Sequence, residues 1–157
     1  MTVRPRFRQV RGRAARALFA TGAAALIGTA ALAAEPGLTV TDGWLRVIIA
    51  GRPAAGYFTV RNDGATPRVL NGARSPACGS LMLHRSTEAG GQERMEMVAT
   101  ATVPAHGTLR FTPGDYHLMC MQPTAAVRPG AKVPVTLTFA DGGTVSGNFM
   151  VRGAKGQ

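Results

Sequence analysis

Residues 81–98 carry the sequence LMLHRSTEAGGQERMEMV. Two short runs within it, Leu81–Ser86 and Glu93–Val98, flank the segment Glu88–Gly91, which ends in two glycines. Short runs bounded by turn residues are typical of β-strands, and a short glycine-containing break between two such runs is typical of a hairpin turn. This stretch therefore predicts an antiparallel hairpin with histidine and methionine side chains on its strands.

Short strand-like runs and turns alternate along the rest of the chain as well. Breaks fall at Ala105–Gly107, Pro113–Gly114 and Asp141–Gly143, and no apolar pattern with a period of 3.6 residues is long enough for a core helix. The pattern predicts an all-β chain folded as an antiparallel β-sandwich. The further expected strands are Leu38–Val47, Tyr57–Arg61, Arg68–Leu70, Thr108–Thr112, His117–Met121, Val133–Phe139 and Thr144–Val151.

The N-terminal segment has the composition of an export signal. Six arginines precede the apolar stretch Ala17–Leu32, and Ala31–Ala33 offers a small-x-small cleavage pattern. We therefore expect a cleavable signal peptide at 1–33 and one domain at 34–157. An uncleaved membrane anchor is the alternative for the apolar stretch. No adjacent arginine pair precedes that stretch, so the general secretory route is the simpler expectation.

This segment also accounts for most of the basic charge. The whole chain has 18 Lys and Arg against eight Asp and Glu, a net charge of +10. Six of the arginines lie within 1–33, so the remaining domain has 12 basic residues against eight acids, a net charge of +4. No Lys/Arg-rich run remains, which argues against nucleic acid as a partner. We also expect no stable membrane insertion after cleavage.

Four residues in the central part of the chain form a candidate metal site. They are His84, Met95, His117 and Met119, spaced as His-x10-Met-x21-His-x-Met. Two imidazoles and two thioethers make a neutral, soft donor set that suits Cu(I). The set needs no thiolate, which is an advantage in an oxidising compartment where free thiols are lost to oxidation.

The spacing and its flanks resemble a known family. The four positions match the motif of periplasmic copper chaperones of the PCuAC type, and the segments Arg94–Met97 and Pro113–Met119 resemble the regions around its ligands. The resemblance extends from about Leu38 to Val151. It implies a cupredoxin-like β-sandwich that binds Cu(I) through the four motif residues and releases it by ligand exchange.

The resemblance also implies a location and a partner. It places the protein in the periplasm, with a copper-accepting protein as partner, either cytochrome c oxidase during assembly of its copper centre or another copper chaperone. Some relatives carry a His/Met-rich C-terminal extension, whereas residues 152–157 here contain no ligand type. We therefore expect one copper ion per chain and no enzymatic activity.

Two cysteines, Cys78 and Cys120, leave two alternatives open. They form a disulfide, which is the favoured interpretation in an oxidising compartment, or they are two separate buried thiols. The alternation of side chains in a strand places Cys120 on the opposite face from His117 and Met119. The same alternation places Met121 on the face of His117 and Met119, Met97 on the face of Met95, and Met82 on the face of His84. These three methionines either surround the ligands or pack in the fold.

Other functions remain as alternatives. A blue-copper electron carrier on a similar sandwich would need a cysteine thiolate with two histidines and a weak axial methionine. An extracytoplasmic β-sandwich for adhesion or assembly would use the same His and Met as packing. An enzyme is disfavoured because Glu93 and Glu96, the acids nearest the motif, are expected on opposite strand faces. Tyr116 beside His117 would cover the site, orient the His117 ring or simply pack in the fold. His106 is expected in a loop outside the site.

Overall fold

The computed structural model describes Met1 and residues 37–156, so the expected signal peptide and its boundary lie outside the described residues. Among the described residues, no helix has the length and apolar character that crossing a membrane requires. The described chain from residue 37 onward is built from ten strands. In order, these are β1 Leu38–Arg46, β2 Ala54–Asn62, β3 Arg68–Arg74, β4 Cys78–Ala89, β5 Gln92–Met97, β6 Ala101–Val103, β7 Gly107–Phe111, β8 Tyr116–Pro123, β9 Lys132–Phe139 and β10 Thr144–Arg152.

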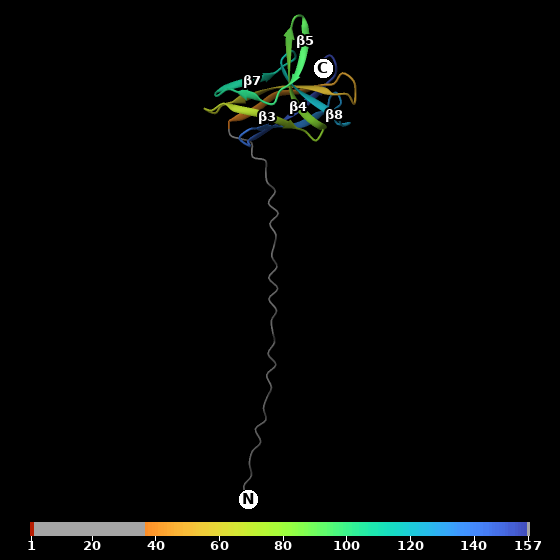
Figure 1. Ribbon diagram of the computed structural model, residues 1–157. Helices are drawn as coiled ribbons and strands as arrows, with labels where there is room; N and C mark the ends of the chain where they lie inside the picture. Colours follow the sequence, from red (N-terminus) through yellow and green to blue (C-terminus); the bar gives the residue numbers. More distant parts are fainter. Residues whose placement is uncertain (2–36, 157) are drawn as a thin grey trace. The chain divides into compact units, whose positions relative to one another are not determined.

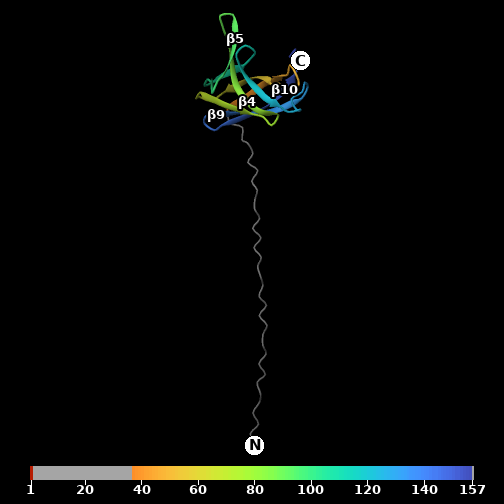
Figure 2. The same cartoon turned by 45° about the vertical axis from the view of Figure 1, so that its right-hand side comes forward.

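The strands close into a barrel-like sandwich. Neighbouring strands follow the order β5-β4-β8-β2-β1-β10-β9-β3-β6, and a further pairing of β3 with β4 through Ala73 and Leu81 closes the ring. The β4–β5 hairpin rises from this body, with β5 at its outer side (Figures 1 and 2). β2 is shared, because its first part pairs with β8 and its second part pairs with β7.

The all-β sandwich expected from the sequence is confirmed, and its details differ in three respects. β1 pairs with β10 in parallel, while the other pairings are antiparallel. The three-residue strand Ala101–Val103 was not expected, because so short a run carries too little alternation to be recognised. Several strands are longer than expected. β4 begins at Cys78, which pairs with β8, and continues to Ala89 because the hairpin turn is tighter than the sequence indicated.

The interior is filled by the inward side chains of nearly every strand. β9 shows the alternation clearly, with Val133, Val135, Leu137 and Phe139 buried and the residues between them more exposed. Burying such side chains is the main favourable term in folding. The largest fully buried side chains are Phe111, Phe149, Leu45, Leu70, Leu118, Leu137, Val60, Val103, Val133, Val135, Val151 and Asn62.

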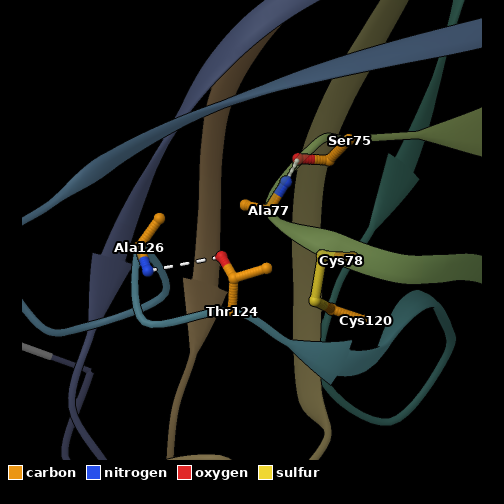
Figure 3. Close-up of a disulfide and its surroundings, with 6 residues drawn as sticks. All are labelled: Ser75, Ala77, Cys78, Cys120, Thr124 and Ala126. Carbon is orange, nitrogen blue, oxygen red and sulfur yellow. Dashed lines mark hydrogen bonds between the residues drawn. A yellow bond between two sulfur atoms is a disulfide. The ribbon is translucent and has the colours of Figure 1, made fainter.

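A disulfide joins two neighbouring strands. Cys78 at the start of β4 and Cys120 in β8 are bonded, with their Cα atoms 5.4 Å apart (Figure 3). This confirms the disulfide over two separate thiols, and Cys120 is fully buried in the core as its strand position predicts. Beside the bridge, the Ala77 N–H donates a hydrogen bond to the Ser75 hydroxyl at 3.1 Å. The covalent link therefore fixes β4 against β8.

Candidate metal centre

The hairpin that carries Met95 owes its shape to two glycines. Ala89 pairs with Gln92, so the loop between them is only Gly90-Gly91, with φ angles of 63° and 77°. Positive φ at both central positions of a two-residue loop is the requirement of the tight hairpin turn that matches strand twist, and glycine adopts it without strain. All six residues of β5 are exposed. The hairpin predicted by the sequence is thus confirmed, and it presents its outer strand to solvent.

Strand register brings the histidines together. β4 lies between β5 and β8, and His84 is directly opposite His117 in β8 and Met97 in β5. Met82 is opposite Met119 in the same register. Paired residues and residues two apart share one face of a sheet. These side chains therefore occupy one face of three adjacent strands, and the inward Leu118 and Cys120 occupy the other.

The two imidazole rings have free coordinating atoms. The rings are stacked with centroids 5.8 Å apart and an angle of 17° between their planes. The Nδ1 of His117 lies 3.0 Å from the carbonyl oxygen of Asp115, which accepts and so requires the proton on Nδ1. This leaves the Nε2 of His117 with its lone pair, and that atom and the Nδ1 of His84 are buried without a hydrogen-bond partner. Unpartnered buried ring nitrogens on adjacent strands fit a bound metal ion.

Asp115 holds this arrangement from the loop before β8. Its carbonyl oxygen also accepts a hydrogen bond from the Ser86 N–H at 3.2 Å, and its carboxylate pairs with the Nε of Arg85 at 3.0 Å. One residue thus ties the loop to β4 and orients the His117 ring. Fixing the orientation of a metal-binding imidazole through its second nitrogen is a common feature of metal sites.

The environment keeps the ring of His84 neutral. Burial lowers the pKa of His84 below its ordinary value of 6.5, and the neighbouring His117 lowers it further, while the backbone of Met82 opposes this shift. Burial also raises the pKa of the Tyr57 hydroxyl; Arg46 counteracts that effect and Glu93 adds to it. At neutral pH both groups are therefore uncharged, and an imidazole must be neutral to donate to a metal.

A cavity of about 580 Å³ opens beside the histidines. His117, Met119 and Met95 line it together, so three of the four predicted ligands face the same space. Its other walls combine apolar and charged groups. The remaining lining residues are Arg46, Ile48, Pro53, Ala55, Tyr57, Ser86, Thr87, Glu88, Glu93, Pro113 and Gly114.

The predicted ligands come from three adjacent strands. His84 lies in the middle of β4 and is flanked by strands on both sides. Met95 pairs with Ser86 and exposes 56% of its surface, on the outer strand β5. Because β4 pairs with β5 and β8 at once, the four candidate donors lie on one face of these three strands.

Several residues near the motif are excluded from the site. Tyr116 packs against Phe111, with ring centroids 5.6 Å apart, and the Arg85 guanidinium lies 4.9 Å from its ring centroid. His106 is exposed in the turn between β6 and β7. The chain's two cysteines are bonded to each other, so the thiolate that a blue-copper centre needs is not available. Within the described residues, no group of three or more His, Cys, Asp and Glu could hold a metal, so a site here depends on methionine.

Sequence reasoning missed the residues that shape the cavity. Tyr57 approaches His117 with ring centroids 6.4 Å apart, and Trp44 packs against Tyr57 with centroids 4.7 Å apart and an angle of 42° between the ring planes. Ile48 and Ile49 are exposed by 65% and 62% in the loop after β1. Ile48 lines the cavity, and the isoleucine pair before Ala50-Gly51 was the one available sequence signal for this loop.

Comparison with known proteins identifies the family. Residues 38–151 match the family described as "Putative lipoprotein LpqE-like". The chain belongs to the LpqE-like family. It is also 36% identical over 109 residues to "Putative lipoprotein Lxx21020" of Leifsonia xyli subsp. xyli (strain CTCB07). That match covers 69% of this chain and 65% of the relative, so the chain spans slightly less than two thirds of the relative's length.

Two solved structures of similar fold have names that mention copper or CuI, and one of them is a PCuAC domain. The solution structure of CuI-DR1885 from Deinococcus radiodurans is 32% identical, with a TM-score of 0.60, covering 76% of this chain and 80% of that one. The copper-bound PCuAC domain from PmoF2 is 21% identical, with a TM-score of 0.62, covering 74% and 93%. The second similarity concerns the fold alone. The expected resemblance to PCuAC domains is confirmed at the level of fold.

Proposed function

We propose that this protein is an exported copper carrier that binds one Cu(I) through His84, Met95, His117 and Met119. The observation that carries the proposal is the pairing of His84 with His117, stacked on neighbouring strands with a free, buried nitrogen on each ring. Thioethers complete the set, because Met119 and Met95 line the cavity beside His117. Two structural relatives, the copper-bound PCuAC domain from PmoF2 and CuI-DR1885, support the choice of metal.

The donor chemistry favours the monovalent ion. Four neutral ligands leave the bound Cu(I) with its single positive charge, and soft thioethers disfavour the harder Cu(II). A thioether has no proton to lose, so only the two imidazoles exchange protons for the metal. The protein would therefore carry copper in one oxidation state and release it when an acceptor supplies stronger donors.

Location and acceptor follow from the leader and the resemblance. A signal peptide at 1–33 would export the domain 34–157 to the periplasm, and relatives named as lipoproteins support an envelope location. The acceptor is a copper-binding protein, and the resemblance to PCuAC chaperones favours cytochrome c oxidase during its assembly or a second copper chaperone. Carriage of an ion requires no bond making in a substrate, and we assign no catalytic residue.

Anaerobic titration of residues 34–157 with Cu(I), combined with X-ray absorption, tests this function. We expect one tightly bound Cu(I) per chain with mixed sulfur and nitrogen scatterers. His117→Ala should remove most of the affinity, and His106→Ala, at an exposed histidine outside the site, is the matched control. Two tight ions per chain, or a shell of only nitrogen and oxygen, would contradict the assignment. Absence of binding would favour the adhesion or assembly alternative.

A further inference from the structure

Potential copper donors around the site differ steeply in their exposure. Met97 exposes 71% of its surface and Met95 56%, Met119 is half-buried, and His117 exposes only 3%. This gradient follows the strand order from the outer β5, across β4, to β8. The methionine sulfurs are therefore most exposed on β5 and less exposed on β8, where the buried His117 imidazole lies.

Met97 is the outermost of these donors and stands next to the site. It is the direct partner of His84 in the β4–β5 pairing, and the side chains of such a pair share a face with Cβ atoms about 5 Å apart. Packing gives little reason for a methionine here, because most of its surface is in water and burial would stabilise the fold only in proportion to the area removed. On its outer side, β5 has no strand partner in the described sheet.

We propose that Met97 and His84 form an entry and exit site for Cu(I), which rests on the proposed function of the neighbouring ligands. The sulfur of Met97 donates a lone pair to an incoming Cu(I) as that ion loses a weakly held small ligand. His84 takes up the ion next, and the donors of His117, Met119 and Met95 then displace Met97. The ion stays Cu(I) throughout, and the thioether neither gains nor loses a proton.

The assignment has a kinetic signature. A residue that binds copper only in passing contributes to the barrier and not to the end states. Removing it must slow loading and release by the same factor, because their ratio sets the dissociation constant. A permanent ligand behaves differently, since its loss changes that constant.

Stopped-flow measurements on Met97→Leu test the inference. Under anaerobic conditions, the apo protein is mixed with Cu(I) supplied as its acetonitrile complex, and release is followed into an excess of a Cu(I) chelator. The sole tryptophan, Trp44, reports loading through Tyr57, which lies between it and His117. Met121→Leu is the matched control, because Met121 shares the methionine face but lies opposite Ser80, away from His84.

We expect Met97→Leu to slow loading and release at least about fivefold while the dissociation constant stays within about twofold. Met121→Leu should leave both rates near those of the wild type. Unchanged rates in Met97→Leu would overturn the entry site. A larger dissociation constant with an unchanged loading rate would also overturn the entry site, because Met97 would then be a permanent ligand. Failure of the proposed function looks different, since the wild type itself would then bind no Cu(I).

Discussion

At one end of the β4–β8 pair, Cys78 and Cys120 are bonded to each other and buried; toward the other end, His84 and His117 face each other with unpartnered ring nitrogens. The same two strands build both regions. The disulfide region belongs to the core and has no group left to react. The histidine region lies beside an open cavity and adjoins an exposed hairpin.

This contrast shows how one strand can serve stability and binding at once. In β8, Leu118 and Cys120 are buried in the core, while Met119 and Met121 between and beyond them are only half-buried on the opposite face. A slip of one residue would exchange the two sets. A covalent bond near the far end of the pair therefore supports the register that keeps His84 opposite His117.

The largest expected effect comes from removing the disulfide between Cys78 and Cys120. Replacing both Cys78 and Cys120 by serine should lower the free energy of unfolding by up to about 4 kcal/mol, from the loop entropy of a bridge with a sequence separation of 42. Urea unfolding measures the loss. Cu(I) affinity of the folded variant should stay near that of the wild type, because neither sulfur faces the metal.

The copper measurement decides whether the two regions are separate. A folded double variant, shown by its circular dichroism, that binds no Cu(I) would mean that the disulfide end controls the site through register. That result would contradict the assignment of stability to the disulfide region and of copper binding to the histidine region.

A second prediction concerns substitutions of the candidate methionine ligands in the histidine region, referred to below as the donor end. Met95→Leu or Met119→Leu should weaken Cu(I) binding tenfold or more, about 1.4 kcal/mol, because each substitution removes one permanent thioether. Leucine nearly conserves the volume of methionine, so thermal stability should change little. Competition against a Cu(I) chelator gives the affinities. No loss at Met95 would remove that residue from the ligand set.

The sequence was sufficient for the fold class and for most strands. Turn residues such as Gly90 and Gly91 and the alternation within β9 are local signals, and both are confirmed. The parallel pairing of β1 with β10 could not be predicted, because it joins segments about 100 positions apart and depends on how the whole sheet closes. β6 was missed because three residues carry too little pattern.

The candidate site was predictable as a set of residue types and not as a place. The spacing of His84, Met95, His117 and Met119 named the candidate donors, and the structure places them on one face of three adjacent strands. The position of that face depended on the pairing of β4 with two strands at once. The hydrogen bond from His117 to the Asp115 carbonyl is local, but it depends on the conformation of the loop before β8, which the sequence did not reveal. The approach of Tyr57 is a tertiary contact between β2 and β8 with no local sequence signal.

A third and smaller effect concerns the pH dependence of the apo protein. The pKa of His84 is lowered in the folded state, so the unfolded chain binds more protons as the pH falls below 6.5. Stability should therefore decrease from pH 6.5 down toward the lower folded pKa and then level off. His84→Gln should remove this part of the acid loss in urea unfolding at pH 7.5 and 5, whereas His106→Gln should leave it in place. An equal acid loss in His84→Gln and wild type would show that the ring is not buried as neutral imidazole.

The smallest expected effect tests which methionines at the donor end are permanent copper ligands. Met97 and Met121 share the face of the ligands but lie opposite His84 and Ser80, one strand repeat from Met95 and Met119. Their replacement by leucine should change the Cu(I) dissociation constant by less than about twofold, because packing is conserved and no permanent donor is lost. Circular dichroism controls for folding, and the same chelator competition measures binding. Equal losses at all four methionines would instead describe a site in which copper shifts among several thioethers, and the donor end would then have no fixed ligand set. A small effect at these two positions, beside a large one at Met95 and Met119, would place the boundary between permanent ligands and neighbours within single strands, with the two methionines that line the cavity beside His117 as the permanent ligands.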